Sequence, residues 1–192
     1  MAIASRAEPR YTYEQYVGIE QVSNTKHEFY DGKIYAMAGG TEDHSSIQTT
    51  VVATLVNALG GRGKCRVHGS DMRTYVEIAG MAAFPDCSVI RGAFEQHAKS
   101  PNATALNPSV LVEVTSESSE EYDRTVKLEA YQTIQTLREY VIVSHRERRV
   151  TVYTRGERGW ISRVAIGGSK IAVESIGVEI VVDTLYQDTS IR

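Results

Sequence analysis

Three side chains of this sequence could together bind a divalent cation and a phosphate: Asp86, Glu113 and Lys127. Glu113 lies within VLVEV (110–114), an apolar run typical of a buried strand. A carboxylate buried without a partner costs several kcal/mol or becomes protonated, so we expect Glu113 to have one. Asp86 follows Pro85 in the preceding strand, FPDCSVI (84–90). If the two strands are neighbours, the carboxylates converge, and Mg²⁺ or Mn²⁺ between them would relieve their repulsion.

Lys127 extends this constellation from the helix predicted over residues 118–134. At helical spacing its face is shared with Asp123, Ala130, Tyr131 and Ile134. Because most of that face is apolar, we expect the Lys127 ammonium to point toward the sheet and reach the same pocket. A metal lowers the pKa of a bound water, and a nearby cation stabilises charge at a reacting phosphorus. The three residues therefore suggest phosphodiester hydrolysis.

Plainer explanations stay open for each acid. Glu113 could reach solvent at a strand edge, and Asp86 after a proline could be only a turn residue. Asp123 and Lys127, four residues apart, could form an exposed ion pair worth about 0.3–0.5 kcal/mol. That explanation suits Asp123 better than Lys127, because an acid in the first turn also interacts favourably with the helix dipole.

Three further residues are candidates for supporting roles. His44 shares a helical face with Ile47 and Val51, so it either lies in solvent at the first turn or faces the site. Glu28 is either a cross-strand partner of a neighbouring side chain or an additional acid of the site. Tyr131 is better explained as a core residue than as a catalytic one.

Two local patterns predict the elements that position the first acids. Lys26–Met37 reads as two β-like arms around Asp31-Gly32, a strong hairpin signal since both turn positions need positive φ. The next segment repeats apolar residues every four positions, which predicts a helix over 41–61 ending at Gly60-Gly61. Either Thr41 or Asp43 could cap its start.

The remaining patterns complete an α+β fold with an α/β-type core. We expect a mixed central sheet flanked by helices, with an N-terminal hairpin and a C-terminal antiparallel strand extension. A short helix is predicted at 11–19, a polar connection at 91–108, and a Ser118-x-x-Glu121 capping box before the later helix. The predicted strands cover 65–78, 84–90, 109–115, 139–144, 149–155, 159–166 and 171–182.

Bulk properties restrict the class of protein. The 192 residues suggest a single domain over 1–192, with a flexible N-terminal segment at 1–10. The net charge of −3 argues against a broadly basic surface, so nucleic-acid binding needs a local patch. Cys65 and Cys87 form no CxxC pair, which suggests reduced thiols in a cytoplasmic protein. No apolar run approaches the ~20 residues that cross a membrane, so no membrane partner is expected.

One ordered set of residues carries a family resemblance. The set comprises Glu28 with Asp31-Gly32, Met37, Thr41-x-x-His44, Pro85-Asp86, Asn107-Pro108, Glu113-Val114, Ser116, Tyr122-Asp123, Lys127, Tyr131, Leu137-Arg138-Glu139-Tyr140 and Gly159-Trp160. In this combination the chain resembles the Uma family of restriction-endonuclease-like proteins, a branch of the PD-(D/E)XK nuclease superfamily, over about residues 12 to 183.

The resemblance implies a nuclease-like core and makes Asp86 and Glu113 metal ligands. The core would be a helix, a three-stranded meander, a second helix and a further strand. The lysine that the wider superfamily places two residues after the glutamate is replaced here by Thr115. Lys127 matches the position from which the Uma family supplies its lysine.

The sequence thus predicts a Mg²⁺- or Mn²⁺-dependent endonuclease acting on DNA. Asp86 and Glu113 would hold the metal, and Lys127 would orient the attacking water or neutralise developing charge. The supporting residues would be Glu28, His44, Asp123 and Tyr131. RNA as substrate would use the same residues and stays open. A catalytically silent nucleic-acid-binding or protein-interaction module is the alternative, and the resemblance suggests a homodimer.

Overall fold

The computed structural model describes residues 10–60, 64–100 and 104–192. The flexible segment expected at 1–10 therefore lies outside the described residues, apart from Arg10, and so does Gly61. No described helix has the length and apolar character needed to cross a membrane. Both cysteines are free thiols, Cys87 buried and Cys65 partly so.

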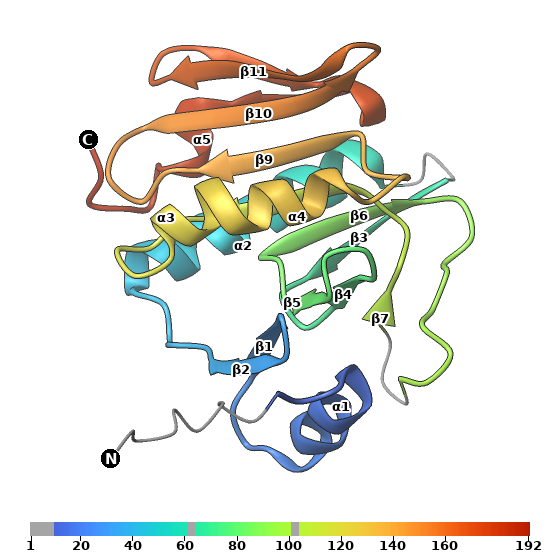
Figure 1. The fold of residues 1–192 in the computed structure, drawn as a ribbon. Helices are drawn as coiled ribbons and strands as arrows, with labels where there is room; N and C mark the ends of the chain where they lie inside the picture. The colour runs from blue at the N-terminus through green and yellow to red at the C-terminus, as the bar shows by residue number, and fades with distance from the viewer. Residues whose placement is uncertain (1–9, 61–63, 101–103) are drawn as a thin grey trace, which may run out of the picture.

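A mixed six-stranded sheet forms the centre of the fold, as predicted (Figure 1). Strands β8 and β9 are parallel, and every other neighbouring pair is antiparallel. The strand order is β11-β10-β9-β8-β6-β3. Their bounds are β3 Cys65–Gly69, β6 Cys87–Arg91, β8 Pro108–Val114, β9 Glu139–Val143, β10 Arg149–Gly156 and β11 Gly159–Ile166.

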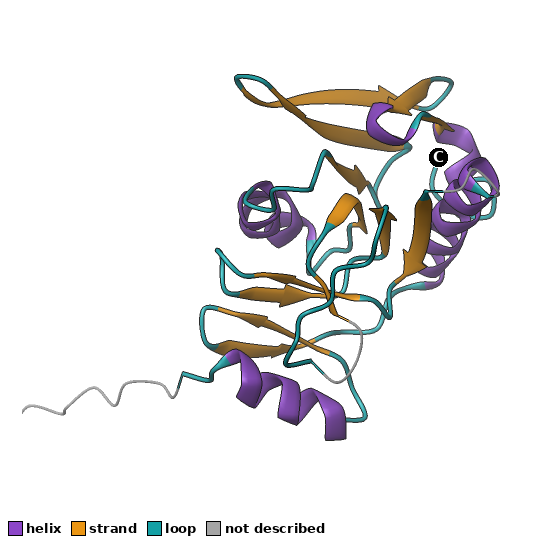
Figure 2. Ribbon diagram, turned by 90° about the vertical axis from the view of Figure 1, so that its right-hand side faces the viewer, coloured by secondary structure: helices purple, strands orange, loops and turns teal. Residues whose placement is uncertain are grey.

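Helices cover both faces of this sheet (Figure 2). Helix α2 (Glu42–Leu59) packs its apolar stripe on one face, against Val110 and Val112 of β8. The opposite face holds Leu111, packed with Tyr131 of the helix that follows β8. Since side chains alternate along a strand, Glu113 lies on the face of Leu111 rather than on that of α2.

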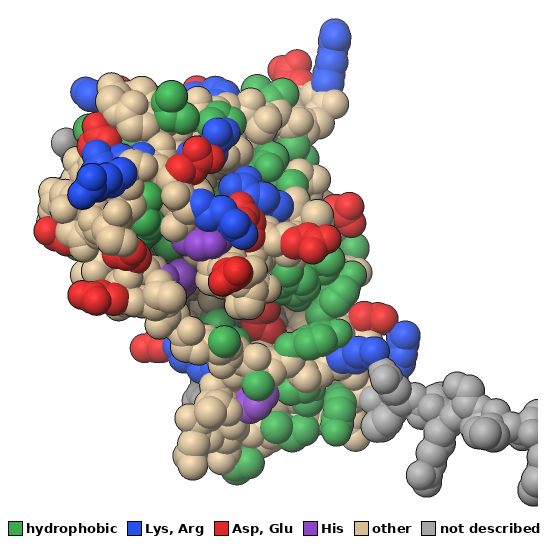
Figure 3. Space-filling view, turned by 90° about the vertical axis from the view of Figure 1, so that its left-hand side faces the viewer, with side chains coloured by type: hydrophobic (Ala, Val, Ile, Leu, Met, Phe, Trp, Pro, Cys, Tyr) green, Lys and Arg blue, Asp and Glu red, His purple; other side chains and the backbone are tan. Residues whose placement is uncertain are grey.

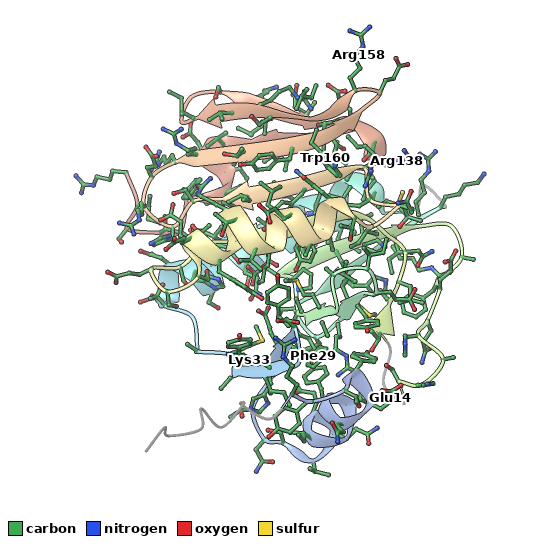
Figure 4. The ribbon with its side chains drawn as sticks, in the orientation of Figure 1. Glu14, Phe29, Lys33, Arg138, Arg158 and Trp160 are labelled. Atoms are coloured by element: carbon green, nitrogen blue, oxygen red, sulfur yellow. The ribbon has the colours of Figure 1, made fainter. Side chains whose placement is uncertain are left out.

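The N-terminal hairpin is confirmed. Strands β1 (His27–Tyr30) and β2 (Lys33–Ala36) pair in the expected register, and Asp31 and Gly32 have φ of 47° and 77°. The hairpin belongs to a second sheet of order β2-β1-β5-β4-β7, with β4 Arg73–Val76, β5 Met81–Ala83 and β7 Thr104–Ala105. Phe29, on one hairpin face, packs toward α1 (Tyr13–Val22) (Figure 4).

Three predicted strand or loop segments differ from the structure. The strand predicted at 65–78 is two strands in separate sheets, because a turn closed by Met72 N–H donating to Gly69 O (3.1 Å) redirects the chain. The strand predicted at 84–90 begins only at Cys87, and β5 precedes it. The connection at 91–108 contains the short strand β7.

The helix after β8 is also different from the expected one. It begins at Glu120 with Ser119 at the N-cap, so the capping box of Ser118 and Glu121 is wrong. The Ser119 hydroxyl instead donates to Asp123 Oδ2 at 2.7 Å. The helix comprises α3 (Glu120–Tyr122), a π-helical stretch (Asp123–Lys127) and α4 (Leu128–Gln132), ending before residue 134.

Helix α2 and the C-terminal region follow the prediction closely. Thr41, not Asp43, caps α2 by accepting from His44 N–H, and the helix ends at Gly60. The antiparallel extension of β9, β10 and β11 is confirmed. Residues 171–182 form most of a separate pair, β12 (Lys170–Val173) and β13 (Val178–Val181), joined by a 3-10 turn and followed by α5 (Val182–Leu185).

Candidate active site

The sheet register brings Asp86 and Glu113 to the same end of neighbouring strands. Cys87 of β6 pairs with Val112 of β8, so extending that antiparallel register by one residue sets Asp86 beside Glu113. Both line a pocket of about 890 Å³ and are 8% and 4% exposed. The two strands are therefore neighbours in the sheet, as the predicted convergence of Asp86 and Glu113 requires.

Lys127 lies at the centre of the buried charges. Its Nζ is 3.1 Å from Glu113 Oε1, 3.0 Å from Glu28 Oε1 and 3.2 Å from Asp123 Oδ1. Lys127 is 5% exposed and Asp123 is 1% exposed. The exposed ion pair considered for Asp123 and Lys127 is therefore wrong, because both side chains lie inside the pocket wall.

The π-helical stretch helps to bring these side chains together. It spans Asp123 to Lys127, so the helix is wound more widely where it faces the sheet. One turn later, the hydroxyl of Tyr131 donates to Glu113 Oε1 at 2.9 Å. Tyr131 is thus both the core residue that the sequence suggested and a direct partner of the site carboxylate. Tyr140 also contributes, donating to the Asp123 carbonyl at 3.1 Å.

Asp86 is held from the other side, by α2 and β8. Its Oδ1 accepts from Gln48 Nε2 and its Oδ2 from Val114 N–H, each at 2.7 Å. His44 Nε2 lies 2.9 Å from the Val114 carbonyl, which requires a proton on that nitrogen, and 3.7 Å from Asp86 Oδ2. His44 therefore faces the site, which is one of the two positions that its helical face allowed.

Gln48 is a site residue that the sequence reasoning missed. It follows His44 by four residues on α2, so both lie on the same helical face. The four-residue spacing from His44 is the sequence signal that could have identified Gln48. Thr115, which the resemblance places at the superfamily's lysine position, does not line the pocket, and its hydroxyl lies 2.8 Å from His145 Nδ1.

The charges of the site are unbalanced. Burial raises the pKa of Asp86 and raises that of Glu113 well above its ordinary value. Burial by itself lowers the pKa of Lys127, but the carboxylates of Glu113, Glu28 and Asp123 raise it well above the usual range overall, so the ammonium stays charged. Three of the four buried carboxyl groups thus contact the one ammonium, and the fourth, Asp86, lies beside Glu113, which favours binding of an additional cation.

The donor atoms suit a hard divalent cation. Glu28 Oε1 and Asp123 Oδ1 are buried and, among described residues, have no hydrogen-bond partner beyond their ionic contact with Lys127. Both hydrogen bonds that Glu113 accepts from described residues go to Oε1. Carboxylate oxygens are the ligands that Mg²⁺ and Mn²⁺ prefer. Among the described residues, no group of three or more His, Cys, Asp or Glu side chains is arranged to hold a metal ion by itself.

The pocket opens on the side of the molecule formed by the hairpin and the start of the helix after β8. In Figure 3 acidic side chains lie recessed between the upper and lower parts of the molecule, beside apolar surface. Aromatic and thioether side chains line the pocket around the acids: Tyr30, Tyr35, Met37, Phe84 and Tyr122. The site is therefore acidic at its floor and apolar along its walls.

Comparison with known proteins gives one family and one fold. The model of the Uma2 family, described as "Putative restriction endonuclease", matches residues 12–183. Two uncharacterised proteins of Synechocystis are similar to this chain. The first is 30% identical, and the match covers 93% of this chain and 93% of that protein. The second is 28% identical, and the match covers 81% of this chain and 88% of that protein. A crystal structure titled as a "putative nuclease belonging to DUF820" from Anabaena variabilis has a TM-score of 0.76, 16% identity, and covers 92% of this chain and 97% of that one.

Proposed function

Because this chain belongs to the Uma2 family of restriction-endonuclease-like proteins, we propose that it is a divalent-metal-dependent endonuclease that hydrolyses phosphodiester bonds in DNA. The observation that carries the proposal is the meeting of Asp86, Glu113 and Lys127 in one pocket. Two acids that can hold a metal ion and an ammonium that can stabilise charge at phosphorus are groups that catalyse phosphodiester hydrolysis.

Asp86 and Glu113 would hold Mg²⁺ or Mn²⁺. When bound, such a cation polarises the phosphoryl group and makes water a better nucleophile at neutral pH. Gln48 and the Val114 amide fix the Asp86 carboxylate by hydrogen bonds, while Tyr131 and Lys127 fix that of Glu113. Both carboxylates are therefore oriented in advance, which reduces the cost of arranging them around a cation.

Lys127 supplies the positive charge of the protein at the reacting phosphate. Its ammonium touches three carboxylates, and a phosphate entering the pocket would compete with Glu28 and Asp123 for it. Those two contacts lack hydrogen-bond geometry, so they are the ones most easily exchanged. His44 and Glu28 support the site from α2 and β1.

The test measures cleavage and metal binding separately. Plasmid and single-stranded DNA are incubated with purified protein in EDTA, Mg²⁺ or Mn²⁺, and Mn²⁺ affinity is measured by calorimetry. The variants are Asp86→Asn, Glu113→Gln and Lys127→Met. Glu179→Gln is the matched control, because Glu179 is exposed on β13 and pairs only with Lys170 among described residues.

We expect metal-dependent cleavage that the three site variants lose and the control keeps, with Mn²⁺ affinity reduced in the two acid variants. Cleavage that survives in Asp86→Asn and Glu113→Gln would show that these residues are not the active site. Metal binding without any cleavage would favour the catalytically silent module instead.

A further inference from the structure

Exposed aromatic and thioether side chains line the mouth of the candidate active site. Tyr35 is 47% exposed and Met37 is 37% exposed, both on the side of the hairpin that borders the pocket. Tyr35 is the direct cross-strand partner of Glu28, whose carboxylate contacts Lys127 at 3.0 Å. An apolar ring thus stands next to the buried charges, where water rather than protein covers it.

A second aromatic side chain faces the same space with an unused polar atom. Tyr122 of α3 lines the pocket, and the Lys127 ammonium lies 5.6 Å from its ring centre. Its hydroxyl is buried and has no hydrogen-bond partner among described residues. Burial raises the pKa of this hydroxyl, so it remains a neutral donor and acceptor. This hydroxyl therefore has unused hydrogen-bonding capacity in the pocket wall.

The pocket wall has few cations with which to hold a nucleic-acid duplex. Of the lining residues that the structure describes, Lys127 alone is a lysine or arginine. Its charge is already shared among three carboxylates. Proteins that bind duplex DNA neutralise several backbone phosphates with Lys and Arg. This pocket instead offers rings, and base–ring stacking is how proteins bind unpaired strands.

The depth of the site also favours an unpaired strand over a duplex. Asp86, Glu113 and Lys127 are at most 8% exposed, so the reacting phosphodiester has to enter the pocket. The pocket volume of about 890 Å³ is that of a small-molecule site. It can take a nucleotide with its neighbouring phosphates, whereas a stacked duplex would stay at the mouth.

From these observations we propose that the substrate is a single-stranded nucleic acid, with one unstacked base placed against Tyr35 at the mouth and its phosphate directed to the acids. This deepens, and rests on, the proposed nuclease function. Tyr35 is then a residue of substrate binding and specificity, not of the chemical step.

The experiment measures binding without relying on turnover. Fluorescence anisotropy is recorded with a labelled single-stranded oligonucleotide and with its duplex, using Glu113→Gln in Mg²⁺ and the native sequence in EDTA. Tyr35→Ala and Tyr35→Phe are introduced into both. Tyr11→Ala is the control, since Tyr11 is 40% exposed and does not line the pocket.

We expect the single strand to bind at least tenfold more tightly than the duplex. Tyr35→Ala should weaken single-strand binding about fivefold or more, as loss of one stacked base does. Tyr35→Phe and Tyr11→Ala should leave it unchanged. Equal or tighter binding of the duplex would overturn the proposal, and so would single-strand binding that ignores Tyr35→Ala. Absence of cleavage alongside Tyr35-dependent binding would overturn only the nuclease proposal.

Discussion

Oε1 of Glu113 in β8 lies 3.1 Å from Nζ of Lys127 in the following helix, and both side chains are almost completely buried. The ammonium is the partner that a carboxylate in the middle of an apolar strand requires. It also contacts Glu28 and Asp123, so one lysine holds together the hairpin, the central sheet and the helix. Removal of that single charge should therefore affect both stability and function.

Lys127→Met should lower the free energy of unfolding by about 3–5 kcal/mol, because it leaves buried carboxylates without their cation. Urea denaturation in EDTA measures this loss. The double variant Lys127→Met/Glu113→Gln should recover part of it, since one of the stranded charges is then neutral. A loss below about 1 kcal/mol in the single variant would mean that the carboxyl groups are already protonated or solvated.

Gln48→Leu should weaken Mn²⁺ binding about 10- to 100-fold, because residues that orient a metal-binding carboxylate have effects of that size. Gln48 donates to Asp86 Oδ1 at 2.7 Å, and leucine of similar size cannot. Calorimetric titration with Mn²⁺ gives the affinity. Thr49→Ala is the control on the exposed side of α2. Unchanged affinity in Gln48→Leu would remove Gln48 from the site.

Glu139→Gln should cost about 2–3 kcal/mol of stability while leaving Mn²⁺ affinity intact. Glu139 is fully buried, and its oxygens accept from the backbone N–H groups of Glu174 and Ser175, each at 2.9 Å. An amide turns one acceptor oxygen into a donor facing those N–H groups. Glu139 pairs with Val110 at the start of β8, away from Glu113. Thermal or urea unfolding, run beside the metal titration, separates the two effects.

Cys65 should react with an aromatic disulfide reagent at pH 8 in the native protein, whereas Cys87 should not. Burial raises the pKa of the Cys87 thiol to about 12, so almost none of it is thiolate at that pH. Cys65 is partly exposed at the start of β3. Absorbance should report one thiol in buffer and two in urea. Rapid reaction of two thiols in buffer would show that the sheet opens at β6.

Much of the fold was predictable because its signals are local. Asp31-Gly32 sets a hairpin turn through its own backbone preferences, and the four-residue spacing from Ile47 to Leu59 marks a helix on its own. The division of 65–78 into two strands was not predictable in this way. Both halves have strand character, and only their pairing partners in two different sheets separate them.

For the candidate site, too, some features were predictable from local sequence and others were not. The sequence alone determined that an acid stands in an apolar strand, that a second acid lies at the preceding predicted strand, and that Lys127 shares a helical face with Asp123 and Tyr131. Only the tertiary structure decided that Glu28 reaches Lys127 and that Gln48 reaches Asp86, since these pairs are far apart along the chain. Local chemistry selects elements, whereas strand register and helix packing select which side chains meet.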